Sequence, residues 1–369
     1  MTAVIALANR MVLASAVLTD PGSGVGRWVA ANWLMLLIMV AVGIVLAIAL
    51  TILAKWSRIA MNIFLDNTIT VTTNLQDYEP STGEIVSFMS RDGRTLRGMF
   101  VDRPPGLPDR GTVIFCHEFS SDMFSAGRYA WPLASAGYTV FTFDFRGHGR
   151  SSSPRGYEVR HWPSQHEVND LLAAVAFVKT RRDIRKTGLG ILGVSRGASA
   201  ACIAAVLNSD IQCLVLDSVF STDYLVDHMI RRWATIFSHI DLSETTEPIF
   251  SCRLVRAIMM LYVELKLRCR FPSARKALVR LDQVPALFIA GERDTYVRPE
   301  YQRTLFNTKA GEKEMWVCPN AKHNQAVATD PKTYAEKILT FFGKHLSAGS
   351  EAAEQSESAS GRKQRQMAG

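Results

Sequence analysis

The sequence of 369 residues lacks closely spaced cysteine pairs. This absence excludes a cysteine-based metal site and a dense disulfide framework. Four of the six cysteines stand in apolar runs. There an unpaired cysteine is common as a small hydrophobe, so the pattern favours a reducing compartment. Cys252 and Cys269 remain a candidate disulfide pair.

Nucleic-acid-binding motifs are also lacking, although the net charge is +8. Residues 221–280 contain ten Lys and Arg against six Asp and Glu, which accounts for half of the excess. No helix-turn-helix, zinc finger or base-stacking motif accompanies these charges. We therefore expect no nucleic-acid partner, and a basic surface that faces a membrane explains the regional charge better.

Charge is missing altogether from residues 28–54, which are dense in Leu, Ile, Val, Met and Ala. About 20 apolar residues are enough to span a bilayer, so this stretch predicts one transmembrane helix. Trp28 and Trp33 on one side and Trp56 on the other suit membrane–water interfaces. The alternative is a cleaved signal peptide, whose apolar region is usually shorter and nearer the start of the chain.

The orientation of this helix depends on few charges. Arg27 precedes it, whereas Lys55 and Arg58 follow it. The positive-inside rule therefore places the large C-terminal part in the cytoplasm, by a margin of one residue. The prediction is a single-pass membrane protein.

Composition divides the rest of the chain. Residues 1–27 form an N-terminal segment to which the sequence assigns no role, and residues 55–84 are predicted to be a connector. Residues 85–346 are predicted to form one globular domain. Residues 347–369 contain too few apolar groups to pack and predict a disordered tail.

Strand and helix patterns alternate through residues 85–346 after an opening β-hairpin in residues 85–101. This alternation predicts the α/β class, with a mostly parallel twisted sheet and helices on both faces. Long helical patterns interrupt it at about residues 221–280, which we expect to form an inserted cap. The apolar residues of the cap exceed what a solvated helix needs, and they either bind an acyl chain or pack on the core.

The pattern Gly193-Val194-Ser195-Arg196-Gly197 follows an apolar run and precedes a helical pattern rich in alanine. This is the order strand, sharp turn, helix. The turn strains its central residue, so the residues two positions away must be small, and both are glycine. Ser195 is expected to stand exposed at the turn, with the N-terminus of the following helix aimed at it.

The motif resembles the nucleophile elbow of the α/β-hydrolase family, which orders its catalytic triad as serine, acid and histidine. The resemblance implies Ser195, Asp294 and His323, each just after a predicted strand. Histidine has the pKa that a base for serine needs, and a carboxylate fixes its tautomer. Asp217 also follows a strand and is the rival acid. His345 is expected instead to interact with the end of the last helix.

The resemblance further implies two backbone N–H donors for an oxyanion. Arg196 supplies the first, and the match of His117-Glu118-Phe119 to the family's His-Gly-x motif assigns the second to Phe119. Glutamate replaces the family's glycine at position 118, where its side chain can point to solvent.

Residues 144–151 match the D-x-R-G-H-G-x-S loop of the branch that contains monoacylglycerol lipases and serine aminopeptidases. The resemblance to this branch covers roughly residues 85–346. We expect His148, in the loop, to be structural.

These features predict a membrane-anchored serine hydrolase that cleaves a lipid or other acyl ester through an acyl-serine intermediate. The triad needs no cofactor and no metal. One alternative is a serine aminopeptidase-like peptidase, with Glu118, Glu244 and Glu247 as scattered candidates to bind a substrate amine. The other is a non-enzymatic hydrolase-fold scaffold at the membrane.

Overall fold

The computed structural model describes residue 22 and residues 24–66, 83–153, 155–238 and 250–346. The predicted tail lies outside these ranges, as do most of the N-terminal segment and most of the predicted connector. The chain separates after Ala60 into two compact units.

The helix α2 (Gly24–Leu65) forms the described part of the first unit, apart from its last turn. Among the described residues, it is the one helix long and apolar enough to cross a membrane. It continues beyond the predicted end at residue 54, because residues 55–65 contain neither proline nor glycine. The first part of the predicted connector is therefore helical.

An eight-stranded sheet forms the centre of the second unit, in the order β1-β2-β4-β3-β5-β6-β7-β8. The strands are β1 (Glu84–Met89), β2 (Thr95–Val101), β3 (Thr112–Cys116), β4 (Thr139–Phe143), β5 (Leu189–Val194), β6 (Cys213–Asp217), β7 (Ala286–Gly291) and β8 (Lys313–Cys318). Strand β2 pairs antiparallel with β1 and β4, and all other neighbours are parallel. The predicted α/β class and the opening hairpin are confirmed.

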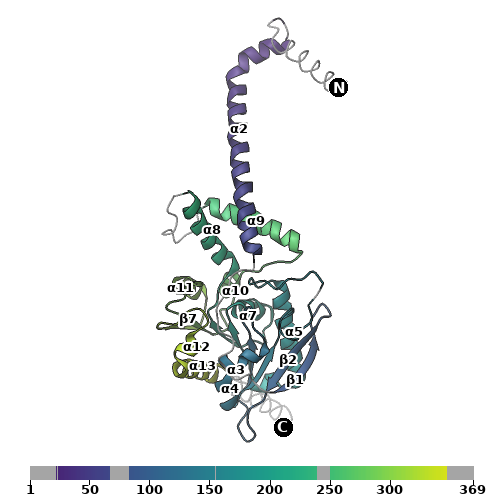
Figure 1. Cartoon of the computed structure of the whole chain (residues 1–369), viewed down its shortest axis with the longest axis vertical. Helices are drawn as coiled ribbons and strands as arrows, with labels where there is room; N and C mark the ends of the chain where they lie inside the picture. The colour runs from purple at the N-terminus through teal and green to yellow at the C-terminus, as the bar shows by residue number, and fades with distance from the viewer. Residues whose placement is uncertain (1–21, 23, 67–82, 154, 239–249, 347–369) are drawn as a thin grey trace, which may run out of the picture. The chain divides into compact units, whose positions relative to one another are not determined.

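Helices pack on both faces of the sheet around two apolar clusters (Figure 1). One face carries α5 (Gln165–Arg181), α7 (Arg196–Leu207), α10 (Ala274–Val279) and α11 (Pro299–Thr308). The other carries α3 (Ala126–Tyr129), α4 (Trp131–Ser135), α12 (Ala326–Thr329) and α13 (Pro331–Leu346). Two short elements, η1 (Met123–Ser125) and α6 (Ile184–Thr187), lie in connections.

The predicted cap contains two long helices that pack against each other, α8 (Thr222–Ser238) and α9 (Phe250–Leu267). Residues 239–249 lie outside the described residues. The cap was expected to run to about residue 280, but α10 buries Ala274, Ala277 and Leu278 in the core beside α7. Because α10 belongs to the layer on the sheet, the cap ends before it.

The second unit begins earlier than predicted, at Met61 rather than near residue 85. Phe64 stacks on Trp162 with ring centroids 4.9 Å apart and meets Phe271 edge-on at 5.2 Å. The Trp162 indole N–H donates to the Phe64 carbonyl at 3.0 Å. The last turn of α2 is therefore a packed part of the globular unit.

All six cysteines fall in the described part of the chain, and each is a buried free thiol. Cys252 and Cys269 therefore do not form the candidate disulfide.

Candidate active site

The turn between β5 and α7 holds Ser195 in strained backbone geometry, with φ of 51° and ψ of −111°. A Cβ atom at Gly193 would lie 2.6 Å from Ala198 Cα, and one at Gly197 would lie 2.2 Å from the Cys116 carbonyl oxygen. Both approaches are shorter than real Cβ contacts, so only glycine fits at either position. The sequence pattern thus builds a sharp elbow pressed against the end of β3.

Three side chains from separate strand ends form one hydrogen-bonded chain at this elbow. Ser195 Oγ lies 3.0 Å from His323 Nε2, and His323 Nδ1 lies 2.6 Å from Asp294 Oδ2. The other carboxylate oxygen of Asp294 accepts two backbone N–H groups, from Tyr296 at 2.9 Å and Val297 at 2.8 Å. An Nδ1–H donated to Asp294 leaves Nε2 free to accept the serine proton, which is the geometry that a general base needs.

Asp217, the rival acid, does not contact His323 in this chain of hydrogen bonds. Its Oδ1 accepts from the Ser218 hydroxyl at 2.9 Å, and Ser218 Oγ in turn accepts the backbone N–H of Asn324 at 3.2 Å. Burial raises the pKa of Asp217 to about 6. The structure therefore places the carboxylate of Asp294, and not that of Asp217, in hydrogen-bond contact with the His323 imidazole.

The backbone N–H groups of Phe119 and Arg196 are among those near the elbow that have no acceptor within the described residues. Arg196 is the first residue of α7, and Phe119 lies in the loop after β3. Strands β3 and β5 are neighbours, with Cys116 opposite Gly193. Unpaired donors on adjacent strand ends can stabilise an oxyanion formed at Ser195.

Glu118 contradicts the expectation of a solvent-facing side chain, because it is 1% exposed. Its Oε1 accepts the Tyr129 hydroxyl at 3.1 Å. Burial raises the pKa of Glu118 to about 7. The neighbouring His117 accepts the Phe145 backbone N–H at Nε2, 3.2 Å away, so the loop that carries Phe119 is held from inside the fold.

Comparisons with known proteins identify the superfamily of this chain. A family described as serine aminopeptidase, S33, matches residues 108–253. A solved esterase from Pyrococcus furiosus, Pf2001, is 25% identical with a TM-score of 0.52, over 73% of this chain and 91% of the esterase. The chain is an α/β-hydrolase.

Two curated relatives of this α/β-hydrolase extend the comparison. The uncharacterized protein YfhR of Escherichia coli O157:H7 is 24% identical over 275 residues, which cover 72% of this chain and 82% of YfhR. An epoxide hydrolase of Caballeronia sordidicola is 26% identical over 147 residues, which cover 40% of this chain and 38% of that enzyme.

Aromatic residues that the sequence patterns did not reveal surround the site of this hydrolase. His161 stacks on Phe220 at 5.2 Å, contacts the Phe119 ring at 5.6 Å and is hydrogen-bonded to the Tyr296 hydroxyl. The Tyr296 ring packs edge-on against His323 at 5.1 Å. Ser195 was expected to be exposed but is 2% exposed. Burial lowers the pKa of His161 to about 3, so its ring is neutral.

The Arg196 side chain fixes the residue that follows the nucleophile. Its guanidinium lies 2.7 Å from Glu167 Oε1, and both side chains are buried. Glu167 also accepts the Ser164 backbone N–H at 2.6 Å in the capping box at the start of α5. The elbow is therefore attached to α5 by a buried ion pair.

Hydrogen bonds and ion pairs hold the loop 144–151 in the fold. Asp144 accepts two backbone N–H groups, at 2.6 and 2.7 Å, and Arg146 forms ion pairs with Asp170 and Asp92 at 2.5 and 2.8 Å. Burial lowers the pKa of His148 to about 3, and its Nδ1 lies 3.2 Å from the Arg146 carbonyl. These contacts are consistent with the structural role expected for His148.

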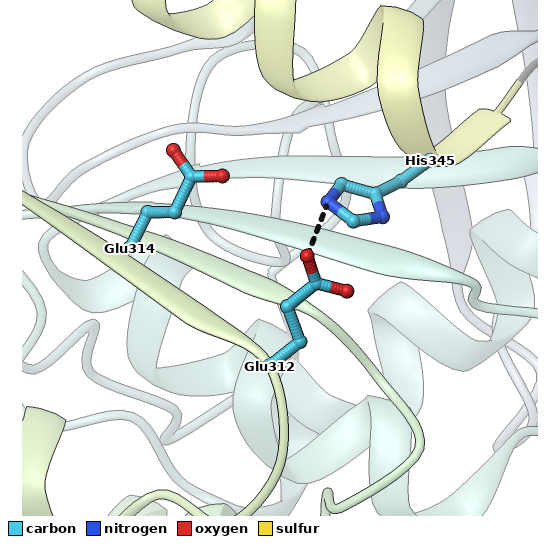
Figure 2. Close-up of side chains that lie close together, drawn as sticks. All are labelled: Glu312, Glu314 and His345. Carbon is cyan, nitrogen blue, oxygen red and sulfur yellow. Dashed lines mark ion pairs between the residues drawn. The ribbon is translucent and has the colours of Figure 1, made fainter.

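Figure 2 shows a separate group, Glu312, Glu314 and His345, whose side chains are near enough to share a metal ion. The Lys344 ammonium lies 2.5 Å from Glu312 Oε1 and 3.8 Å from Glu314 Oε1. His345 was expected to interact with the end of its helix, but its Nε2 faces Glu312 Oε1 at 3.8 Å. Because the Lys344 ammonium already pairs with both carboxylates, we assign this group an ion-pairing role.

Proposed function

We propose that the chain is a serine hydrolase that cleaves carboxylic esters through an acyl-serine intermediate. The observation that carries the proposal is the Ser195–His323–Asp294 chain, with distances of 3.0 and 2.6 Å, on a strained elbow. Serine is a weak nucleophile at neutral pH, and a neighbouring imidazole activates it. An intact hydrogen-bonded triad of this kind argues against a non-enzymatic scaffold.

The proposed reaction has two halves. His323 Nε2 takes the Ser195 proton while Oγ attacks the ester carbonyl, and the N–H groups of Phe119 and Arg196 bind the resulting oxyanion. His323 then gives the proton to the leaving alkoxide, and the acyl-serine remains. The same imidazole then deprotonates a water molecule, whose oxygen attacks the acyl carbonyl. The bond from the acyl carbon to Ser195 Oγ breaks, His323 returns its proton to Oγ, and the carboxylic acid leaves. Asp294 holds the tautomer and stabilises the imidazolium in both halves.

A serine aminopeptidase is the second candidate, because residues 108–253 match the family of that description. A peptidase of this kind needs an acidic group to bind the substrate amine. Glu118 is buried and bonded to Tyr129, whereas Glu244 and Glu247 lie outside the described residues. The similarity to the esterase of Pyrococcus furiosus favours an ester.

A substrate panel tests the choice. The full-length protein in detergent is assayed with p-nitrophenyl esters of graded acyl length and with aminoacyl p-nitroanilides, beside Ser195→Ala. We expect Ser195-dependent ester cleavage with little anilide cleavage. Anilide cleavage that exceeds ester cleavage would support the peptidase, and no turnover of either class would contradict the proposal.

We also propose that α2 anchors the hydrolase in a membrane as a single-pass helix with the hydrolase domain in the cytoplasm. Residues 28–54 carry no charge, and the same helix continues into Phe64, which packs on Trp162. A retained helix fits this packing better than a cleaved signal peptide. Alkaline extraction and the mass of the mature chain test retention. A C-terminal reporter that is active only outside the cytoplasm tests the side, and a strong signal would overturn it.

A further inference from the structure

The cap helix α9 has two apolar sides. One side packs inward and buries Cys252, Val255, Met259 and Val263. The other side is exposed and carries Phe250, Leu254, Ile258, Leu261, Tyr262 and Leu265, which we call the α9 apolar face. The sequence left open whether the apolar residues of the cap bind an acyl chain or pack on the core. Met259 is committed to packing, whereas Phe250, Leu261 and Tyr262 are not.

The α9 apolar face is continuous along the helix. At 100° per residue, its six members fall within an arc of about 120°, which is a stripe over the whole length of α9. Phe250 is 80% exposed, Leu261 61% and Leu265 69%. Single exposed apolar residues are ordinary, but a continuous exposed stripe marks a surface that binds something apolar.

Basic residues border this face. Arg253 and Lys266 lie on opposite edges of the stripe, and Arg268 and Arg270 follow the end of the helix, all four exposed. The acidic residue of α9, Glu264, is occupied in accepting the Phe271 backbone N–H at 3.1 Å. An apolar stripe between basic edges is the pattern of a helix that lies in the interface of an anionic bilayer.

Arg256 is one of the ten basic residues from which the sequence predicted a surface facing a membrane, but its side chain serves the fold. Its Nε donates to Asp227 Oδ1 at 2.6 Å, and Asp227 is buried on α8. Replacing Arg256 would leave a buried carboxylate without its partner, so this residue is unsuitable for testing membrane contact.

The chain itself limits how far α9 can be from a membrane that holds α2. Phe271, four residues after the end of α9, contacts Phe64 at 5.2 Å. Ten residues separate Phe64 from Ala54, the last residue of the uncharged run. Ten residues span at most about 35 Å even when fully extended, so a bilayer that contains residues 28–54 is within reach of the cap.

We propose that the α9 apolar face inserts into the headgroup region of an anionic bilayer, with Lys266, Arg268 and Arg270 beside the lipid headgroups. The occupant of the face is thus a lipid surface rather than a second protein. This contact would hold the cap, and the hydrolase unit that carries it, against the membrane in which acyl substrates dissolve.

Site-directed spin labelling of the full-length protein in liposomes of mixed phosphatidylcholine and phosphatidylglycerol tests the contact. Labels are placed by Leu261→Cys and Leu265→Cys, with the unsubstituted protein as a control for its buried thiols. The matched control is Leu207→Cys, since Leu207 is 60% exposed at the end of α7, away from the cap. We expect oxygen to relax the labels at positions 261 and 265 more than a water-soluble nickel chelate does, and the reverse at position 207.

Two outcomes would overturn the proposal. One is the same aqueous accessibility at positions 261, 265 and 207. The other is shielding from both relaxants together with a doubled particle mass in detergent, which would show that a second copy covers the face. Replacing Lys266, Arg268 and Arg270 by glutamine should reduce the oxygen preference in anionic liposomes and leave it unchanged in neutral ones.

An activity measurement extends the test and rests on the proposed esterase function. Leu261→Glu combined with Leu265→Glu should lower cleavage of a long-chain ester in anionic vesicles by about tenfold or more, because a charged stripe cannot enter the interface. Cleavage of a short soluble ester should stay within about twofold, and Leu207→Glu should spare both. Equal losses on both substrates would contradict the role in substrate access. An inactive parent protein would instead refute the esterase function and leave the labelling result standing.

Discussion

Replacing Glu118 with glutamine should change how the stability of the protein depends on pH. Burial raises the pKa of this carboxyl from 4.5 to about 7 in the folded chain. The folded state therefore holds the proton more tightly than the unfolded state does. The stabilisation that comes from protonated Glu118 is fully present below pH 4.5 and is lost as the pH rises to about 7. Above that pH, Glu118 no longer changes the free energy of unfolding. Each pKa unit corresponds to about 1.4 kcal/mol, so the loss amounts to about 3 kcal/mol.

Glutamine at position 118 keeps an acceptor for the Tyr129 hydroxyl but cannot ionise, so it should not show this loss. The measurement is the free energy of unfolding in urea, from pH 4.5 to 8, for the detergent-solubilised full-length protein and for Glu118→Gln. Relative to the parent, the variant should gain about 3 kcal/mol across this range. Glu300→Gln, at an exposed position on α11, is the matched control. A difference between parent and Glu118→Gln that does not vary with pH would refute the reasoning.

Three further substitutions test the construction of the site. Asp294→Asn should lower kcat by about 10³-fold or more, whereas Asp217→Asn, whose carboxylate is not hydrogen-bonded to His323, should lower it far less. The opposite ranking in steady-state kinetics would move the acid to Asp217. Arg196→Met should destabilise the fold by about 3–5 kcal/mol, because the buried Glu167 carboxylate loses its cationic partner. Adding Glu167→Gln should restore part of this loss in thermal denaturation, and no restoration would contradict the pairing. Phe64→Ala should lower the free energy of unfolding by about 3–5 kcal/mol through lost contacts with Trp162 and Phe271. Ile63→Ala, on the same turn but 36% exposed, should have a much smaller effect. Equal effects of the two substitutions in urea denaturation would show that the last turn of α2 does not pack as described.

The predictable features were those encoded locally. Gly193 and Gly197 are close enough to Ser195 in sequence to require a tight elbow, and alternating strand and helix patterns are sufficient for a parallel sheet. The resemblance to the α/β-hydrolase family, together with positions just after predicted strands, nominated Ser195, Asp294 and His323, the three side chains that the structure brings together.

The features that were missed depend on contacts between distant parts of the chain. Glu118 looks like a solvent-facing loop residue until Tyr129 is folded over it. Phe64 fits an amphipathic membrane-adjacent helix as well as it fits a packed aromatic cluster, and only Trp162 decides between them. His161 carries no strand-end signal, since its importance comes from Phe119 and Tyr296 on other loops. Periodicity cannot reveal such pairings, because it reports which face of an element is apolar and not what covers it.

Covalent labelling of Ser195 tests the central claim most directly. The full-length protein in detergent is treated with a fluorophosphonate probe, beside Ser195→Ala and beside Ser199→Ala, which removes a buried hydroxyl one turn further along α7. Mass spectrometry of the digested protein then locates the adduct. The account predicts one adduct on Ser195, none in Ser195→Ala, and labelling in Ser199→Ala. A folded parent protein that takes up no probe, or undiminished labelling of Ser195→Ala, would contradict it.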